Sequence, residues 1–371
     1  MDEAATKTKL EDLGYDAFFE SNRQKLGLGD FSIGRVTVEH RGVYKVRSVN
    51  GEYLARITGK QMFKASSRED YPAVGDWVAL EELNEGQGVI RAVLPRKTCL
   101  TRKHGGKNKA QIIATNIDVA FAVESMGRDY NLNRLERYFV IAGAGGIKPA
   151  IILNKVDLIS REDLELKISE IKNRFNDIDF IFTSTVTSEG LAELKAYITK
   201  GKTYCFLGSS GVGKSSLINK LLGENLIKTE KISVSAGRGK HITTSREMYF
   251  LPALRSLGEG AENGGIVIDN PGMREVGMAD SGAGIDKLFD EITGLAEKCK
   301  FADCAHTHEP GCEVLAALAE GKLDADKYSN YINLKKEAEY YKMTELEKRE
   351  KDRQFGKFIK KAKEEISKYK Q

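Results

Sequence analysis

The sequence has no long apolar run. Its longest stretch without a charged residue is the eleven residues from Thr203 to Gly213, well short of the ~20 apolar residues needed to cross a bilayer. The N-terminal residues include the acidic Asp2 and Glu3 and lack the apolar segment of a secretory signal. We therefore expect a cytoplasmic protein with no membrane partner.

Cysteine is scarce, and its count is odd. Three of the five cysteines, Cys299, Cys304 and Cys312, fall within fourteen residues that also contain His306. This clustering beside a histidine favours metal binding over disulfides. Three thiolates and one imidazole form the donor set of a closed structural Zn²⁺ site, which leaves no position for a hydrolytic water. His308 is an alternative to His306 as the fourth ligand.

A strong excess of one charge is also missing. The 371 residues carry 58 Lys and Arg against 54 Asp and Glu, a net charge of +4, so overall charge indicates no particular partner. The length predicts two to three domains. Residues 334–371 are distinct, because their thirteen basic and eight acidic residues give a local charge of +5.

The N-terminal third combines a short amphipathic arm with a β-rich segment. Residues 1–30 predict a helical arm, and residues 31–103 contain five short β-rich runs separated by Gly, Asn-Gly and Pro, typical of an OB-type barrel. Aromatic and basic residues alternate in Tyr44–Arg47 and Tyr53–Arg56, which suits nucleic-acid binding and is equally explained by ordinary strand alternation. The basic segment 96–109, with six Lys and Arg and no carboxylate, fits a phosphate backbone or a solvated linker.

Residues 110–278 alternate apolar β-branched runs with helical segments. This alternation predicts a parallel sheet with helices on both faces. Within it lies a complete G-x-x-x-x-G-K-[ST] motif, whose glycines let backbone N–H groups converge on phosphates. Lys214 would bind the β- and γ-phosphates, and Ser215 would bind Mg²⁺. The predicted phosphate-binding residues are Gly208, Ser209, Ser210, Gly211, Val212, Gly213, Lys214, Ser215 and Ser216.

A guanine-specificity motif, N-K-x-D, closes an earlier apolar run. It consists of Asn154, Lys155 and Asp157. The Asp157 carboxylate can accept hydrogen bonds from both N1–H and the exocyclic amine of guanine, a pair that adenine does not offer, so ATP should be rejected. Ser184, after the next strand, fits a backbone contact to the guanine oxygen. Asn154 precedes Gly208 by 54 residues, whereas ordinary GTPases have the reverse order, so the domain is circularly permuted.

The remaining nucleotide motifs follow the phosphate loop. Asp269 and Gly272 match D-x-P-G, whose Asp reaches Mg²⁺ and whose Gly amide senses the γ-phosphate. Thr243 is our choice of switch ligand to Mg²⁺, with Thr244 as the alternative. Met273 occupies the position where Ras-like enzymes place a water-orienting glutamine, which predicts slow intrinsic hydrolysis. His241 is the catalytic candidate; a contact to a partner or to solvent is its other interpretation.

Taken together, the barrel, NKVD, GSSGVGKSS, GRGKHITT, DNPG and CKFADCAHTHEPGC resemble the circularly permuted ribosome small-subunit-dependent GTPase A (RsgA) family over about residues 31–335. The resemblance implies a multidomain α/β protein that binds the small ribosomal subunit and its rRNA. It implies GTP hydrolysis stimulated by that subunit, late in its maturation, with Mg²⁺ and one structural Zn²⁺. Ile242 and Asn270 depart from the family's usual H-T-T-T and D-T-P-G.

The resemblance also divides the chain, which we expect to be monomeric. The expected parts are an arm (1–30), an OB-type barrel (31–103), a permuted GTPase domain (110–278), a helical zinc-binding domain (279–335) and a basic C-terminal helix (336–371) that contacts rRNA or is merely solvated. Two other functions remain open. Because Met273 replaces the water-orienting glutamine, the protein could instead be an RNA-binding module that uses GTP only for affinity. An ATPase or kinase is the other alternative, and the guanine motif at Asn154 and Asp157 disfavours it.

Overall fold

A computed structural model describes residues 9–103, 110–127, 130–175, 177–223, 227, 246–252, 264–269 and 281–343, with isolated positions beyond. His241, Thr243, Thr244 and Gly272 lie outside the described residues. Two compact units are distinguished, one of residues 1–101 and 111–276 and one of 102–110 and 277–371. No helix in the described ranges is both long and apolar enough to span a membrane.

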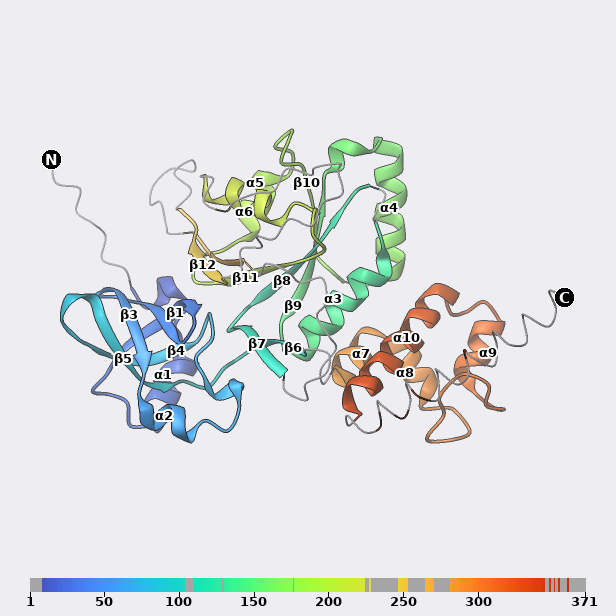
Figure 1. Cartoon of the computed structure of the whole chain (residues 1–371). Helices are drawn as coiled ribbons and strands as arrows, with labels where there is room; N and C mark the ends of the chain where they lie inside the picture. Colours follow the sequence, from blue (N-terminus) through green and yellow to red (C-terminus); the bar gives the residue numbers. More distant parts are fainter. Residues whose placement is uncertain are drawn as a thin grey trace. The chain divides into compact units, whose positions relative to one another are not determined.

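A five-stranded barrel forms the first part of the larger unit (Figure 1). Its strands are β1 (Ser32–His40), β2 (Val43–Ser48), β3 (Gly51–Ile57), β4 (Trp77–Glu82) and β5 (Gln87–Val93), with the short helix α2 (Gly59–Lys64) between β3 and β4. Strand β1 pairs antiparallel with both β2 and β4, which closes the barrel. Its core contains Val36, Val46 and Leu80. The predicted OB-type barrel is confirmed.

The N-terminal arm packs on the outside of the barrel core. Helix α1 (Ala17–Lys25) begins at Asp16, whose carboxylate accepts a hydrogen bond from the Phe18 N–H. Phe19 is buried in a cluster with Leu13 and Trp77. The apolar face that the sequence predicts for this arm is therefore used for packing.

The second part of this unit is a sheet whose described strands run in the order β10-β9-β8-β11-β13-β12. They are β8 (Val119–Ser125), β9 (Lys148–Asn154), β10 (Phe180–Thr183), β11 (Thr203–Leu207), β12 (Glu247–Phe250) and β13 (Ile266–Asp269). Neighbours are parallel except β12, which pairs antiparallel with β13. The expected parallel sheet is confirmed with one antiparallel strand added.

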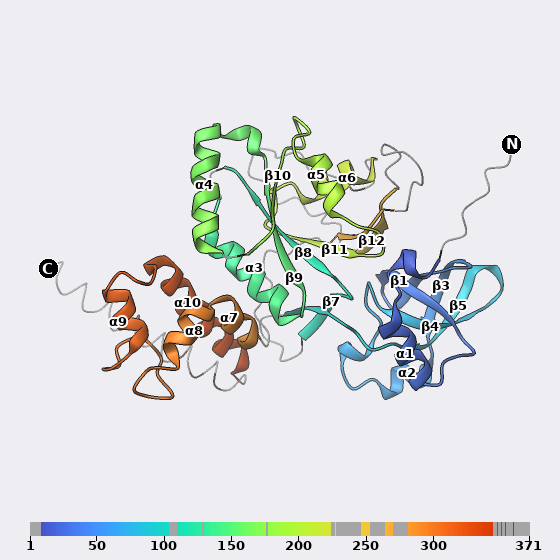
Figure 2. The same cartoon turned by 180° about the vertical axis from the view of Figure 1, so that it is seen from behind.

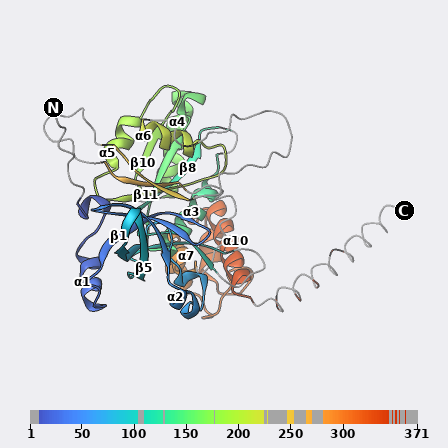
Figure 3. The same cartoon turned by 60° about the vertical axis from the view of Figure 1, so that its left-hand side comes forward.

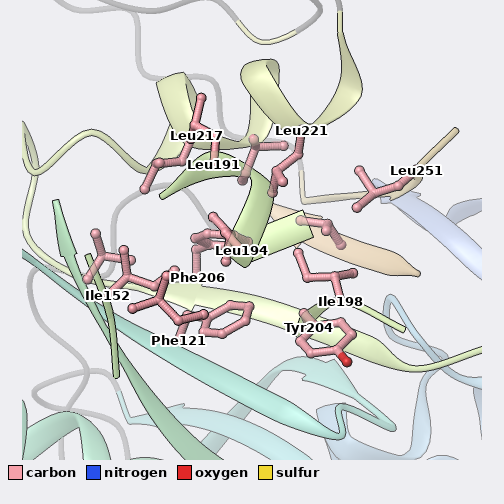
Figure 4. Packing of buried hydrophobic residues seen from close by; sticks show 14 of the residues in the cluster. Phe121, Ile152, Leu191, Leu194, Ile198, Tyr204, Phe206, Leu217, Leu221 and Leu251 are labelled. Carbon is pink, nitrogen blue, oxygen red and sulfur yellow. The ribbon is translucent and has the colours of Figure 1, made fainter. Parts of the chain in front are cut away.

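Helices cover both faces of this sheet (Figures 1 and 2). They are α3 (Leu132–Ala144), α4 (Arg161–Arg174), α5 (Leu191–Tyr197) and α6 (Lys214–Leu222). Under α5 and α6, Phe121 and Phe206 pack against Leu194, Leu217 and Leu221 (Figure 4). Successive residues of the fully buried β8 face opposite sides, as expected of a strand covered on both faces.

Two features join the barrel to this sheet. A two-stranded ladder of β6 (Cys99–Lys103) and β7 (Ala110–Thr115) follows the barrel. More directly, β12 pairs antiparallel with β1 through Val38 and Glu247, so one continuous sheet runs through both parts.

The smaller unit is helical (Figure 3). It contains α7 (Gly282–Leu288), α8 (Asp290–Ala296), α9 (Glu313–Ala319) and α10 (Ala325–Lys342). Phe289 is fully buried between α7 and α8, and its ring stands edge-on to Tyr331 of α10. A small aromatic core therefore holds these helices together.

Candidate functional site

The phosphate-binding motif forms a tight loop between β11 and α6. Gly208, Gly211 and Gly213 have φ values of 156°, 85° and 101°. A Cβ at Gly213 would lie 2.3 Å from the Asn154 side-chain nitrogen, so any other residue would force Asn154 to shift and would strain the backbone. The Lys214 ammonium donates hydrogen bonds to the carbonyl oxygens of Gly208 (2.7 Å) and Ser209 (2.8 Å). The ammonium is thus bound to the loop itself at the N-terminus of α6, and helix N-termini are places where proteins bind phosphate.

The N-K-x-D motif lies against this loop, although it comes earlier in the chain. Asn154 ends β9, is fully buried, and donates from Nδ2 to the Val212 carbonyl (2.8 Å). Lys155 has a φ of 61° and donates from Nζ to the Gly211 carbonyl (2.7 Å). Strand β8 lies between β9 and β11, so the two motifs leave the same edge of the sheet. The permuted segments thus contact each other directly through these hydrogen bonds.

The Asp157 carboxylate, which is predicted to read guanine, is held by a residue that follows the neighbouring strand β10. Ser184, fully buried after β10, donates from Oγ to Asp157 Oδ1 (2.5 Å) and accepts from the N–H groups of Val186 and Thr187. Asp157 itself is exposed, so its other acceptor sites face outward. Thr183 donates to Asn154 Oδ1 (3.0 Å).

Sequence reasoning missed these two side-chain roles. It expected only a backbone contact at Ser184 and did not consider Thr183. The available signal was the placement of both residues at the end of the strand adjacent to β9.

Oxygen ligands suited to Mg²⁺ occur on neighbouring strands. Ser215 lies in the first turn of α6, directly after β11, and the buried Asp269 ends β13, which pairs with β11. A hydroxyl and a carboxylate are hard oxygen donors of the kind Mg²⁺ prefers. Ser210, Val212 and Ser216 occupy the loop and helix start as expected, and Val212 packs into the core beneath α6. The magnesium and nucleotide roles of all these residues stay predictions.

The four predicted zinc ligands converge in the smaller unit. The ligand atoms of Cys299, Cys304, His306 and Cys312 all lie within 4.8 Å of one another. Nδ1 of His306 is 3.6 Å from the Cys299 sulfur and 3.5 Å from the Cys312 sulfur. Burial lowers the pKa of His306, which favours the neutral imidazole that a metal requires. The donor set and its spread fit one metal ion.

The backbone around this cluster is fixed by two further side chains. Glu309 accepts hydrogen bonds from the N–H groups of Ala305, Thr307 and His308, and these bonds hold the pKa of its carboxyl at about 2. Tyr328 donates to the His306 carbonyl (2.6 Å). His308 is exposed and lies outside the cluster, so His306 is the histidine of the site.

Comparison with known proteins agrees with this geometry. The protein-family model described as RsgA GTPase matches residues 93–279 of this sequence. The small ribosomal subunit biogenesis GTPase RsgA 2 of Lactiplantibacillus plantarum is 40% identical over 328 residues, covering 87% of this chain and 89% of that protein. The chain belongs to the RsgA GTPase family.

Other RsgA relatives support the same assignment. The small ribosomal subunit biogenesis GTPase RsgA 1 of Bacteroides thetaiotaomicron is 38% identical over 337 residues, 90% of this chain and 91% of that protein. The crystal structure of YjeQ from Thermotoga maritima matches with a TM-score of 0.60 and 26% identity, covering 83% of this chain and 98% of that one. Membership of the RsgA family makes this protein a GTPase, and the fold expected from the sequence is confirmed.

Proposed function

We propose that the protein hydrolyses GTP when it is bound to the small ribosomal subunit, late in the maturation of that subunit. The observation that carries this proposal is the contact of Asn154 and Lys155 with the phosphate loop at Val212 and Gly211. The residues that we propose for guanine recognition and those for phosphate binding then hold the same nucleotide. The names of the relatives, small ribosomal subunit biogenesis GTPases, support the setting.

Within this pocket each residue has a proposed role. Asp157 reads the guanine, with Ser184 orienting its carboxylate. Lys214 and the loop amides bind the phosphates, and the Gly272 amide senses the γ-phosphate. Ser215, Asp269 and Thr243 would hold Mg²⁺, which neutralises phosphate charge when bound. These groups would stabilise the negative charge that develops on the leaving GDP as the bond between the β- and γ-phosphates breaks.

The attacking water needs a separate group. Met273 stands at the position of the usual glutamine, and a thioether cannot orient water. We assign this role to His241, which precedes Thr243 by two residues. Contact with the small subunit would position it, so we expect slow turnover of the free protein.

The smaller unit contributes to binding of the small ribosomal subunit in this proposal. We propose one structural Zn²⁺ on Cys299, Cys304, His306 and Cys312, whose binding energy stabilises a unit with a small core. The expected domain limits at 31–103, 110–278 and 279–335 belong to the same proposal, as does the basic segment 336–371 as an rRNA contact. A cytoplasmic monomer fits this function.

The deciding experiment is steady-state GTP turnover titrated with purified small subunits. We expect slow turnover alone and a large, saturable increase with subunits. His241→Ala should lose most of that increase while retaining GTP affinity, and Met273→Leu serves as the control variant. Fast turnover without subunits would contradict the proposal, and tight subunit binding without stimulated turnover would indicate an RNA-binding module that uses GTP only for affinity.

A further inference from the structure

A cavity of about 380 Å³ lies where the barrel meets the nucleotide-binding sheet, within the larger unit. Its walls come from the β1–β2 hairpin, the loop before β4, strand β7 and the residue preceding β12. Its charged and aromatic lining includes Arg41, Arg68, Arg246, Tyr71 and Glu39. None of these residues belongs to the predicted nucleotide site. The cavity has the size of a small-ligand site.

The cavity is basic. Three arginines and one carboxylate, Glu39, line it, so these four side chains carry a net charge of +2. Among the described residues, neither Arg41 nor Arg68 forms an ion pair, and both side chains are exposed at the rim. Arg246 is held by a hydrogen bond from Nη1 to the Ile112 carbonyl (3.2 Å). A guanidinium presents its donors in a planar fork that matches phosphate oxygens.

Arg41 is held at the rim by an unusual turn. His40 pairs with Val43, so Arg41 and Gly42 form a two-residue hairpin loop, and both have positive φ values of 50° and 81°. Such turns favour Asn, Asp or Gly at the first position, because larger side chains strain the backbone there. Arginine is therefore less favourable than asparagine or glycine for the turn itself, and the turn fixes the backbone of Arg41 beside the cavity.

We propose that this cavity binds one nucleotide of a single-stranded RNA, with the arginines on a phosphate and the half-buried Tyr71 against the base. Arginine with an aromatic ring is the pair that proteins use for unstacked nucleotides. An acidic peptide would satisfy the arginines but would make no use of the ring. This inference rests on the proposed function, since it names a site for the RNA of the small subunit.

The position of the cavity links RNA binding to the nucleotide state. Arg246 follows the switch candidate Thr244 by one intervening residue and directly precedes β12. Strand β12 joins the barrel through the Val38–Glu247 pair, and the Arg47 guanidinium lies 4.5 Å from the Phe250 ring centre. A nucleotide in the cavity therefore contacts both the barrel and the residue that directly precedes β12. The proposal includes a coupling between RNA affinity and GTP affinity, which acts by the same factor in each direction.

The test measures binding of a short fluorescent single-stranded RNA to the full chain carrying a non-hydrolysable GTP analogue. The variant Arg41→Ala/Arg68→Ala should bind about tenfold more weakly, with the slope of log affinity against log salt reduced by about 0.7. The control is Arg161→Ala, which removes an exposed arginine of α4 outside the cavity. The ratio of RNA affinity with the GTP analogue bound to RNA affinity with GDP bound should also be smaller in the double variant. Basal GTP turnover should not change.

Two outcomes overturn the inference. One is an RNA affinity equal to that of Arg161→Ala, and the other is polyglutamate binding through the same two arginines while RNA binding is unaffected. Small-subunit-stimulated turnover of the unaltered chain, measured alongside, tests the proposed function separately. If stimulation is present and the RNA affinity is unchanged, only the cavity proposal fails. If stimulation is absent, the proposed function fails. The RNA affinities of the double variant and of Arg161→Ala still decide whether the cavity binds RNA.

Discussion

At the scale of single residues, the guanine selection that we propose depends on a hydrogen-bond acceptor, the Asp157 carboxylate. Asp157 can receive two hydrogen bonds from guanine, whereas an asparagine amide would present a donor to one of them. Asp157→Asn should therefore weaken GTP binding by roughly a hundredfold, since charged hydrogen bonds contribute about 1.5–3 kcal/mol each. It should improve binding of xanthosine triphosphate, which carries a carbonyl in place of the amine. Competition binding with the two nucleotides measures this exchange.

Asp177→Asn provides the matched control for this substitution. Asp177 is an exposed carboxylate of the same unit with a φ of 55°, a conformation that asparagine adopts readily. Equal GTP and xanthosine triphosphate affinities in Asp157→Asn and in the control would remove Asp157 from base recognition.

Alanine substitutions at two glycines of the phosphate loop can distinguish the cost of backbone strain from the cost of steric overlap. Gly213 and Gly211 both have positive φ, but a Cβ at Gly213 would meet Asn154 Nδ2 at 2.3 Å, while a Cβ at Gly211 meets nothing within 4 Å. Gly213→Ala should lower the free energy of unfolding of the nucleotide-free protein by about 1–3 kcal/mol more than Gly211→Ala. Urea denaturation of the two variants measures the difference. Similar losses would mean that Asn154 moves aside at little cost.

The motif residues could be predicted from sequence because their chemistry fixes their spacing. Gly208 to Ser215 must follow one another for backbone amides to converge, and Asn154 to Asp157 must follow a strand. Thr183 and Ser184 could not be assigned in this way, since their side chains act across the sheet on residues 27 to 29 positions away. Contacts between neighbouring strands become visible only once the strand order is known.

At the scale of elements, the antiparallel β12 was not predicted. It has four residues and only Met248 is buried, so it lacks the apolar run by which the neighbouring strands were found. Likewise, the run from Gln111 to Ser125 is divided into β7 and β8 at Asn116, which has a φ of 54°. Asparagine tolerates this conformation, and the break lets the chain pass from the barrel ladder into the sheet.

The join between β12 and the barrel includes a cation–π contact that can be tested. Arg47 lies over the face of Phe250, which stabilises the join by about 0.5–1 kcal/mol. A double-mutant cycle of Arg47→Ala and Phe250→Leu should show a coupling of that size in the free energy of unfolding. The control cycle pairs Arg47→Ala with Tyr249→Leu, at the adjacent position of β12 whose ring packs instead against the core under α5 and α6. Coupling that is equal in both cycles would show that the ring of Phe250 has no specific role.

At the scale of the whole molecule, permutation changes which segment follows the γ-phosphate sensor. In this chain the D-x-P-G motif begins at Asp269, the last residue of β13, and the next described helix, α7, already belongs to the smaller unit. No further strand of the nucleotide-binding sheet intervenes in the described residues. We therefore predict that a change in conformation at Gly272 is passed along the chain toward α7.

This connection predicts a difference in hydrogen exchange between nucleotide states. With the GTP analogue in place of GDP, amide protection in residues 281–335 should change, because we expect contact between the γ-phosphate and Gly272 to act on the chain that leads into α7. Strand β8 is the internal control, since it is central and fully buried and should exchange equally slowly in both states. Mass spectrometry of proteolytic fragments resolves the two regions in one experiment. Equal protection of residues 281–335 in both states would show that the permuted order transmits nothing, and the smaller unit would then serve only as a fixed anchor.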